Sequence, residues 1–197
     1  RNLRKRFKCD EPVLLVTNVG GFSEHHHLDP EEKKPLYDRL IQSLQKISTN
    51  DEVEIIPQTM PPFPWHFGGQ RYHNLFVDAN FIQAFHEDTG MRVCLDVSHS
   101  KLACNHLDAS FSEFLKKILP FTAHLHLADA QGVDGEGLQI KDGEIDWVEL
   151  FNLINAHCPN ASFIPEIWQG HKNRGEGAWV ALERLENYSL ATKINLN

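Results

Sequence analysis

The sequence predicts an α/β fold, a (β/α)8 TIM barrel of which the chain carries the C-terminal five βα units. Three observations favour this class. Short apolar runs alternate with longer amphipathic segments along the 197 residues, and such a series implies a parallel sheet covered by helices. Polar side chains gather where the runs end, which is the functional face of a barrel. No G-x-G-x-x-G pattern follows the first run, so a dinucleotide-binding sheet has no support.

Five runs are predicted as strands, because each is short, apolar or β-branched, and followed by Gly, Pro or polar residues. They are PVLLVTNVGG (12–21), VEIIPQTM (53–60), RVCLDVSHS (92–100), TAHLHLADA (122–130) and ASFIPEIWQG (161–170). In the fourth run we expect His126 to point into the barrel and His124 toward the helices.

Five amphipathic segments between and after these runs are predicted as helices. The segment 31–47 places its leucines on one stripe, and 74–90 ends in a glycine cap. The segment 110–119 opens with a serine and 146–158 with an aspartate, which are common N-caps. The last helix is predicted over 177–188.

The length bears on domain organisation. A complete barrel takes roughly 250 residues, and about 200 is the minimum. Five units in 197 residues leave three units unaccounted for. We therefore expect a single barrel domain over residues 1–197, incomplete at its N-terminus, with earlier strands trimmed or supplied by another chain. A homo-oligomer or a larger multidomain chain would supply them, and an open doubly wound sheet is the alternative closure.

The charge balance restricts the partners. Nineteen Lys and Arg stand against 27 Asp and Glu, a formal net charge of −8, whereas nucleic-acid and membrane-surface binders need clustered positive charge. No segment approaches the ~20 apolar residues of a membrane span. The four cysteines, at positions 9, 94, 104 and 158, form no C-x-x-C pair, which disfavours a disulfide framework and a cysteine zinc site. We expect a soluble, cytoplasmic protein.

Four successive strand ends offer metal-ligating atoms: the amide oxygen of Gln58, the carboxylate of Asp96, the imidazole of His126 and the carboxylate of Glu166. Oxygen ligands with one nitrogen suit a divalent metal ion such as Mn, Mg, Co or Zn. His99, three residues after Asp96, would lean over the same site and hold a substrate oxygen. Asp96 as a mere helix cap, and Gln58 as a structural residue, are the alternatives.

Two loops and one strand end suggest contacts to a substrate. The aromatic loop 61–74 carries Trp65, which would form a wall over a bound substrate unless it packs on neighbouring loops. Asp129 trails the H-x-H strand and is a further predicted substrate contact.

The loop 170–179 places His171, Lys172 and Arg174 just before a helix N-terminus. Barrels often bind phosphate at such a place near their last strands. A phosphorylated or carboxylated substrate would fit there, and a solvated basic loop is an equally compatible interpretation.

Four pieces of the chain, in this order and spacing, resemble the xylose-isomerase-like TIM barrels. They are IIPQTMPPFPW, LDVSH, HLHLADA followed by GEGLQIKDGEIDW, and PEIW. This superfamily holds sugar phosphate isomerases and epimerases, inosose dehydratases and apurinic endonuclease family 2 relatives. The resemblance implies that Asp96, His126 and Glu166 bind the metal and that His99 contacts substrate. The segment VDGEGLQIKDGEIDW is also similar to barrels associated with sialic-acid-type synthases.

The chain departs from the family pattern at one ligand. The family usually has Glu after the second of these strands, where this chain has Gln58. An amide can ligate a metal but cannot take a proton, so epimerisation by two bases looks impaired, and chemistry with one base at Glu166 remains. The nuclease branch needs Asp-x-His after the H-x-H strand, where this chain has QIK (139–141), which disfavours DNA repair.

The residues and the family resemblance together predict a divalent-metal-dependent sugar isomerase or epimerase acting on a small sugar or sugar acid. The metal, held by Asp96 and His126, would polarise a carbonyl while Glu166 moves a proton on the neighbouring carbon. The alternative is a non-catalytic sugar-binding or accessory barrel domain of a larger carbohydrate-biosynthesis enzyme. Gln58 is the residue that separates the two hypotheses.

Overall fold

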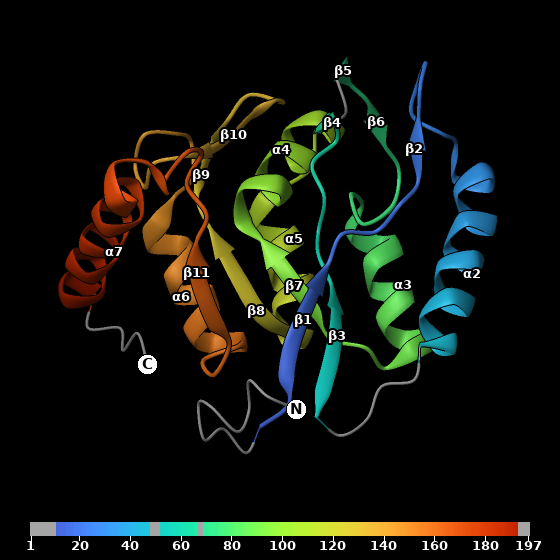
Figure 1. Ribbon diagram of the computed structural model, residues 1–197, viewed down its shortest axis with the longest axis horizontal. Coiled ribbons are helices and arrows are strands. Elements are labelled where there is room, and N and C mark those ends of the chain that lie inside the picture. Colours follow the sequence, from blue (N-terminus) through green and yellow to red (C-terminus); the bar gives the residue numbers. More distant parts are fainter. Residues whose placement is uncertain (1–10, 48–51, 67–68, 193–197) are drawn as a thin grey trace.

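A parallel sheet of five strands forms the centre of the computed structural model, which describes residues 11–47, 52–66 and 69–192 (Figure 1). The strands are β1 (Val13–Thr17), β3 (Val53–Pro57), β7 (Val93–Asp96), β8 (Thr122–Leu127) and β11 (Ser162–Pro165). β1 pairs with β3, β7 with β8, and β8 with β11, all parallel. A bridge between Gln58 and Cys94 joins β3 to β7. Each strand therefore lies beside its predecessor, as in a barrel, whereas a doubly wound sheet reverses its order.

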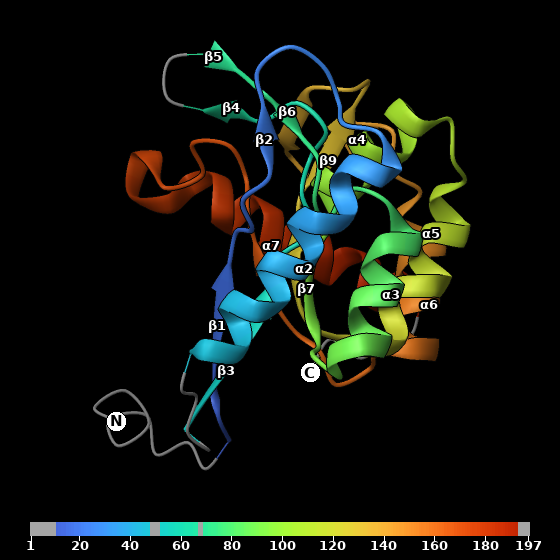
Figure 2. The same cartoon turned by 90° about the vertical axis from the view of Figure 1, so that its right-hand side faces the viewer.

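The helices follow the strands in turn. They are α2 (Pro30–Lys46), α3 (Ala79–Thr89), α4 (Val97–Leu107), α5 (Phe111–Ile118), the short 3-10 helix η1 (Leu119–Phe121), α6 (Trp147–His157) and α7 (Lys172–Thr192). Figure 2 shows α3, α5 and α6 on one side of β1, β3 and β7. In the described residues no ladder joins β1 to β11, so the structure is an open part of a barrel.

Polar N-caps fix the starts of three helices, and of these caps Ser110 and Asp146 were predicted whereas Asp78 was not. The side chains of Asp78, Ser110 and Asp146 accept hydrogen bonds from backbone N–H groups in the first turns of α3, α5 and α6. Gly90 ends α3 with a φ of 68°, a left-handed conformation that glycine adopts without strain. Because Asp78 is the cap, α3 begins at Ala79 rather than at residue 74.

Two further predicted boundaries were wrong. The run 92–100 is a strand only as far as Asp96, and α4 begins at once because Asp96 accepts a hydrogen bond from the backbone N–H of His99. The last helix begins earlier than residue 177, but the backbone of residues 173–175 is left-handed and interrupts it.

Short antiparallel strands, none of them predicted, surround the carboxyl ends of the sheet (Figure 1). They are β2 (Phe22–Ser23) with β6 (Tyr72–His73), β4 (Trp65–His66) with β5 (Gly69–Gln70), and β9 (Asp129–Gln131) with β10 (Gly135–Leu138). They bring residues from the loops to the strand ends, where the polar side chains lie.

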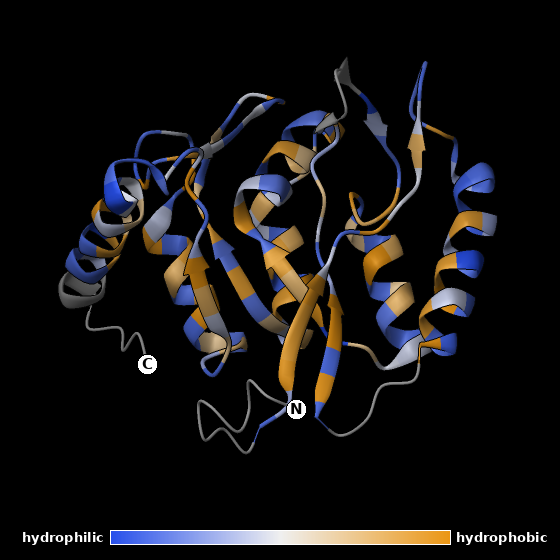
Figure 3. Cartoon of the chain, in the orientation of Figure 1, coloured by the Kyte–Doolittle hydropathy of each residue, from blue (hydrophilic) through white to orange (hydrophobic). Residues whose placement is uncertain are grey.

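The main core lies between the sheet and the helices, and its largest fully buried side chains include Trp147, Phe76 and Phe85. A second, smaller cluster is made by strand residues alone, namely Ile56, Cys94 and Ala123, with Leu14 and Val16 packed against them. β1 is hydrophobic along its length (Figure 3). The two clusters thus mark the outer and inner faces of the curved sheet.

The described residues also bear on the predictions about disulfides and membrane spans. Cys94, Cys104 and Cys158 are buried and form no disulfide, while Cys9 lies outside the described residues. Among the helices that the structure describes, none has the length and hydrophobicity needed to cross a bilayer.

Candidate metal centre and adjoining cavities

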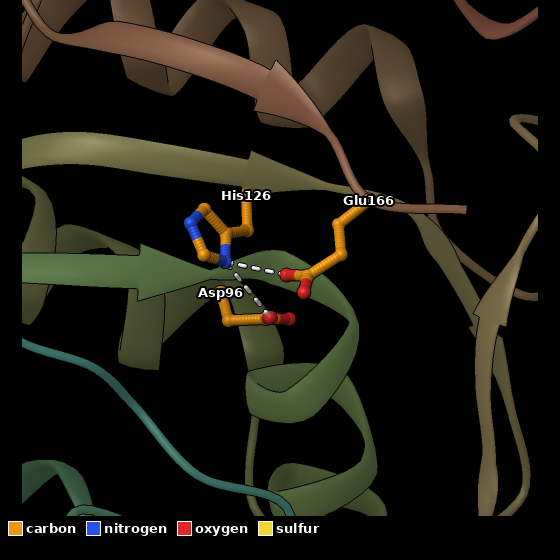
Figure 4. Close-up of side chains that lie close together, drawn as sticks. All are labelled: Asp96, His126 and Glu166. Carbon is orange, nitrogen blue, oxygen red and sulfur yellow. Dashed lines mark ion pairs between the residues drawn. The ribbon is translucent and has the colours of Figure 1, made fainter. Parts of the chain in front are cut away.

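Three metal-ligating side chains meet at the carboxyl ends of neighbouring strands (Figure 4). Asp96 ends β7, His126 lies opposite it on β8, and Glu166 follows β11. Their ligand atoms all lie within 4.8 Å of one another. Nδ1 of His126 is 3.6 Å from Oδ2 of Asp96 and 2.5 Å from Oε2 of Glu166.

The donor set fits a divalent cation. Nδ1 of His126 is buried and lacks a hydrogen bond of acceptable geometry in spite of its two carboxylate neighbours. A buried polar atom without a well-oriented hydrogen bond is costly, and a cation between the three groups would bind this nitrogen together with its two carboxylate neighbours. Two ligands of one ion lie about 3 Å apart, because each metal–ligand bond is about 2.1 Å long. The distances from Nδ1 of His126 to the oxygens of Asp96 and Glu166, 3.6 and 2.5 Å, lie just above and just below this value.

The electrostatics of the triad favour a positive charge at its centre. Burial lowers the pKa of His126, but its contacts with Asp96, Cys94 and Glu166 outweigh burial and raise the pKa to about 12. Burial raises the pKa of Asp96, yet the charge of His99 and the contacts with His126 hold it below its ordinary value. A metal ion would supply the same positive charge in place of a proton.

Asp96 divides its two oxygens between two roles. Oδ1 accepts from the backbone N–H of His99 at 2.9 Å and so caps α4. Oδ2 accepts from Nε2 of Gln58 at 3.0 Å and faces His126. The capping and ligand interpretations of Asp96 are therefore compatible. The amide of Gln58 faces Asp96 as a donor, so Gln58 braces a ligand, and its own role as a ligand stays a prediction.

His99 connects the triad to a residue that the sequence interpretation missed. Its Nδ1 donates to the carbonyl oxygen of Thr59 at 3.0 Å and lies 3.3 Å from Oδ2 of Asp96. Its Nε2 lies 3.5 Å from Oε2 of Glu136 on β10. Burial raises the pKa of Glu136. The one available signal was its position between two glycines in the piece GEGLQ.

Two cavities open at this site and share His99 and Glu136. The first, of about 300 Å³, is lined by residues that include Asp96, Glu166, Trp168 and His171. The second, of about 380 Å³, extends toward β1 and β3, with Asn18, Phe22, Met60 and Pro61 in its lining. Their volumes are at the lower end of the range for small-molecule sites.

Asp129 does not reach these cavities. Its side chain is fully buried, and its oxygens accept from the backbone N–H groups of Ala130, Lys141 and Ile145 and from Nε1 of Trp147 at 2.8 to 3.1 Å. Four donors account for this carboxylate, so it holds the β9–β10 region and the start of α6 together. We do not propose it as a substrate contact.

The structure separates the residues predicted in the two loops. His171 lines the smaller cavity, whereas Lys172 is exposed and donates to Gln169 at 2.9 Å. Arg174 is exposed in the left-handed turn of residues 173–175. The backbone of Trp65 lies in β4, but its side chain falls outside the described part of the chain.

The predicted orientation of His124 was wrong. Its ring lies 5.3 Å from that of His126, and its Nδ1 is 2.7 Å from the Ser162 hydroxyl. Residues two apart on a strand point to the same face, so both imidazoles lie on the inner side of the sheet.

The sequential parallel strands and the triad at their carboxyl ends define a class, the β/α barrels with polar groups at the strand ends. Within this class, the chain belongs to the xylose isomerase-like TIM barrel family, whose model matches residues 9–188. No curated protein matches the chain.

Solved structures with the same fold include proteins of different activities. A D-tagatose 3-epimerase-like protein is 18% identical with a TM-score of 0.67, over 92% of this chain and 63% of that one. The IOLI protein with a binding zinc atom is 12% identical with a TM-score of 0.68, over 94% and 65%. Endonuclease IV from Thermus thermophilus is 17% identical with a TM-score of 0.55, over 88% and 62%. The chain therefore spans less than two thirds of each, and the likeness shows the fold alone.

Proposed function

We propose that the chain forms the metal- and substrate-binding part of a divalent-metal-dependent sugar isomerase or epimerase. The observation that carries this proposal is the buried Nδ1 of His126, which has two carboxylates beside it and no hydrogen bond. The adjoining cavities and the fold shared with a 3-epimerase-like protein support a small sugar as substrate.

A nuclease activity, as in the name of endonuclease IV, is less compatible with this chain. The net charge is −8, which opposes binding to a phosphate backbone. Gln139 stands in the segment where the nuclease pattern needs an acidic residue, and its Nε2 donates to the carbonyl oxygen of Gly177 at 2.9 Å. Gln139 is thus a structural residue.

Each residue has a defined part in the proposed mechanism. Asp96, His126 and Glu166 would hold the ion, which supplies Lewis-acid polarisation of a substrate carbonyl. Glu166, with a side chain 53% exposed beside the cavity, takes a proton from the carbon next to that carbonyl. His99 holds a substrate oxygen, because its ring lines both cavities.

Metal content tests the proposal. Protein purified without chelator should contain about one divalent ion per chain, or bind one on titration with Mn²⁺. Asp96→Asn should lose this ion, because a carboxylate ligand is gone while asparagine still caps α4. Asp78→Asn is the matched control, since Asp78 caps α3 away from the triad. If the unmodified chain binds none of Mn²⁺, Mg²⁺, Co²⁺ and Zn²⁺, the metal mechanism is rejected.

A second candidate function is a sugar-binding accessory domain without turnover. Gln58 favours it, because the amide leaves this strand end without a proton-transferring group. Incubation with ketohexoses and sugar acids in D2O discriminates the two functions. An enzyme exchanges a carbon-bound hydrogen for deuterium, whereas an accessory domain binds sugar, as measured by calorimetry, and exchanges none.

A further inference from the structure

Glu136 is a third carboxyl group on the wall of the cavity that Asp96 and Glu166 line, and it also lines the second cavity. We propose that Glu136 is the second proton-transferring residue of this site, acting on the same substrate carbon as Glu166. It would supply the acid–base group that Gln58 cannot. This inference rests on the proposed sugar isomerase or epimerase function.

The backbone next to Glu136 is held from two sides. The N–H of Gly137 donates to the hydroxyl of Ser98 at 3.0 Å, and its carbonyl accepts from the N–H of Trp168 at 2.7 Å. Gly137 has a φ of 69°, and a Cβ there would lie 3.1 Å from the backbone nitrogen of Trp168. Glycine is therefore required at this position. The β9–β10 hairpin is therefore held to α4 and to the loop after β11. Glu166 lies in that same loop.

The neighbours of Glu136 favour its protonated form. Nδ1 of His99 donates to Thr59, and the other ring nitrogen, Nε2, lies 3.5 Å from Oε2 of Glu136. Burial raises the pKa of Glu136, the charge of His99 lowers it, and Asp96 and Glu166 raise it further. Glu136 as the proton donor and Glu166 as the proton acceptor would then face the same cavity.

The proposed step balances without an oxidant or reductant. Glu166 takes the proton from the carbon next to the carbonyl, and the electron pair of that C–H bond forms the enediolate. The carboxylic acid of Glu136 then delivers its proton to the same carbon, and a new C–H bond forms with the opposite configuration. Afterwards Glu166 releases its proton to water and Glu136 takes one from water, which restores the starting state.

Two rates measured on the full chain with Mn²⁺ test the role of Glu136. D-fructose and D-tagatose are incubated in D2O, and deuterium incorporation and inversion at the carbon next to the carbonyl are followed separately by NMR. Glu136→Gln should keep exchange through Glu166 but lose inversion by at least about 100-fold, the usual contribution of a positioned acid or base. Glu136→Asp should retain part of the inversion, because it keeps a carboxyl group.

Asp134→Asn is the control, because Asp134 is exposed in the same β9–β10 hairpin. Its substitution removes one carboxylate, as Glu136→Gln does. Mn²⁺ binding by every variant reports on folding. Inversion by Glu136→Gln at the unmodified rate would overturn the role of Glu136, as would equal loss of exchange and inversion with Mn²⁺ binding intact. Failure of the unmodified chain to exchange would instead reject the proposed function, and this inference with it.

Discussion

Acidic and imidazole side chains alternate through the site. The series runs from Glu136 to His99, Asp96, His126 and Glu166, with consecutive contacts of 3.5, 3.3, 3.6 and 2.5 Å. Three carboxyl groups thus face two imidazoles. Because burial weakens solvent screening of this excess of acid, the series attracts a cation and favours a proton on the carboxyl group farthest from that cation.

Gln58→Glu tests this charge balance. The substitution replaces the donor at 3.0 Å from Asp96 by a second carboxylate. Without metal, we expect a loss of about 1–3 kcal/mol in unfolding free energy, from the lost hydrogen bond and the like charges. With Mn²⁺, we expect tighter binding by about tenfold or more, because one more negative ligand reaches the ion. Urea unfolding with and without Mn²⁺ measures both effects.

Gln83→Glu is the matched control for that variant. Gln83 also donates to a carboxylate, that of Glu87 at 2.8 Å, but on the exposed surface of α3. Its replacement should change stability by less than about 0.5 kcal/mol, with no effect on Mn²⁺ binding. Unchanged stability of metal-free Gln58→Glu would contradict the close contact with Asp96.

Residue by residue, the sequence predicted the triad more fully than its surroundings. Asp96, His126 and Glu166 were predictable because parallel strands bring their carboxyl ends to one edge. Asp129 also follows a strand, yet its carboxylate is surrounded by donors from residues 130–147. That loop folds back through contacts with no sequence periodicity. Glu136 was missed for the same reason, since β10 has no apolar alternation.

At the scale of elements, strands and capped helices were predictable and the loop hairpins were not. The five parallel strands coincide with the apolar runs, and two helices, α5 and α6, begin at the predicted polar caps. β9–β10 depends instead on contacts with distant residues such as Ser98 and Trp168. α4 was missed because it begins directly at the end of β7, without a loop between them.

One cluster of aromatic side chains should respond to pH. His27, Phe63, Tyr72 and His106 form a ring cluster with centroids 4.5 to 5.7 Å apart. Burial lowers the pKa of both imidazoles, and the charge of Lys33 lowers it further. Both rings are therefore neutral in the folded chain at a pH where unfolded histidine, with a pKa of 6.5, begins to charge.

The sign of the pH effect follows from these shifts. Protonation favours the unfolded chain, so the stability from the neutral rings is complete above pH 6.5 and is lost as the pH falls through the lower folded pKa. Urea unfolding at pH 7.5 and 5.5 should show a drop, reduced when His27→Gln and His106→Gln are combined. His157→Gln, at an exposed position on α6, is the control. An unchanged drop in the double variant would contradict this account.

Across the whole molecule, the triad connects elements that are far apart in the chain. Its residues come from β7, β8 and the end of β11, and the last of these strands lies at one end of the open sheet. The end strands also carry exposed apolar residues, with Leu15 of β1 52% and Ile164 of β11 44% exposed. A cation held by three strands would therefore oppose separation of β11 from the sheet.

This geometry predicts that Mn²⁺ stabilises the whole domain. A ligand that binds only the folded state at 100 times its dissociation constant adds about 2.7 kcal/mol. For a chain of this size, that free energy raises the unfolding midpoint by about 5–10 °C. Thermal unfolding followed by circular dichroism, with Mn²⁺ or with EDTA, measures the shift. Because the effect requires the ligands, Asp96→Asn and His126→Asn should abolish it, and Asp78→Asn should retain it. A full shift in the two triad variants would mean that the ion binds elsewhere, and the triad would then be an ion-pair network that holds β11 to β7 and β8 without metal.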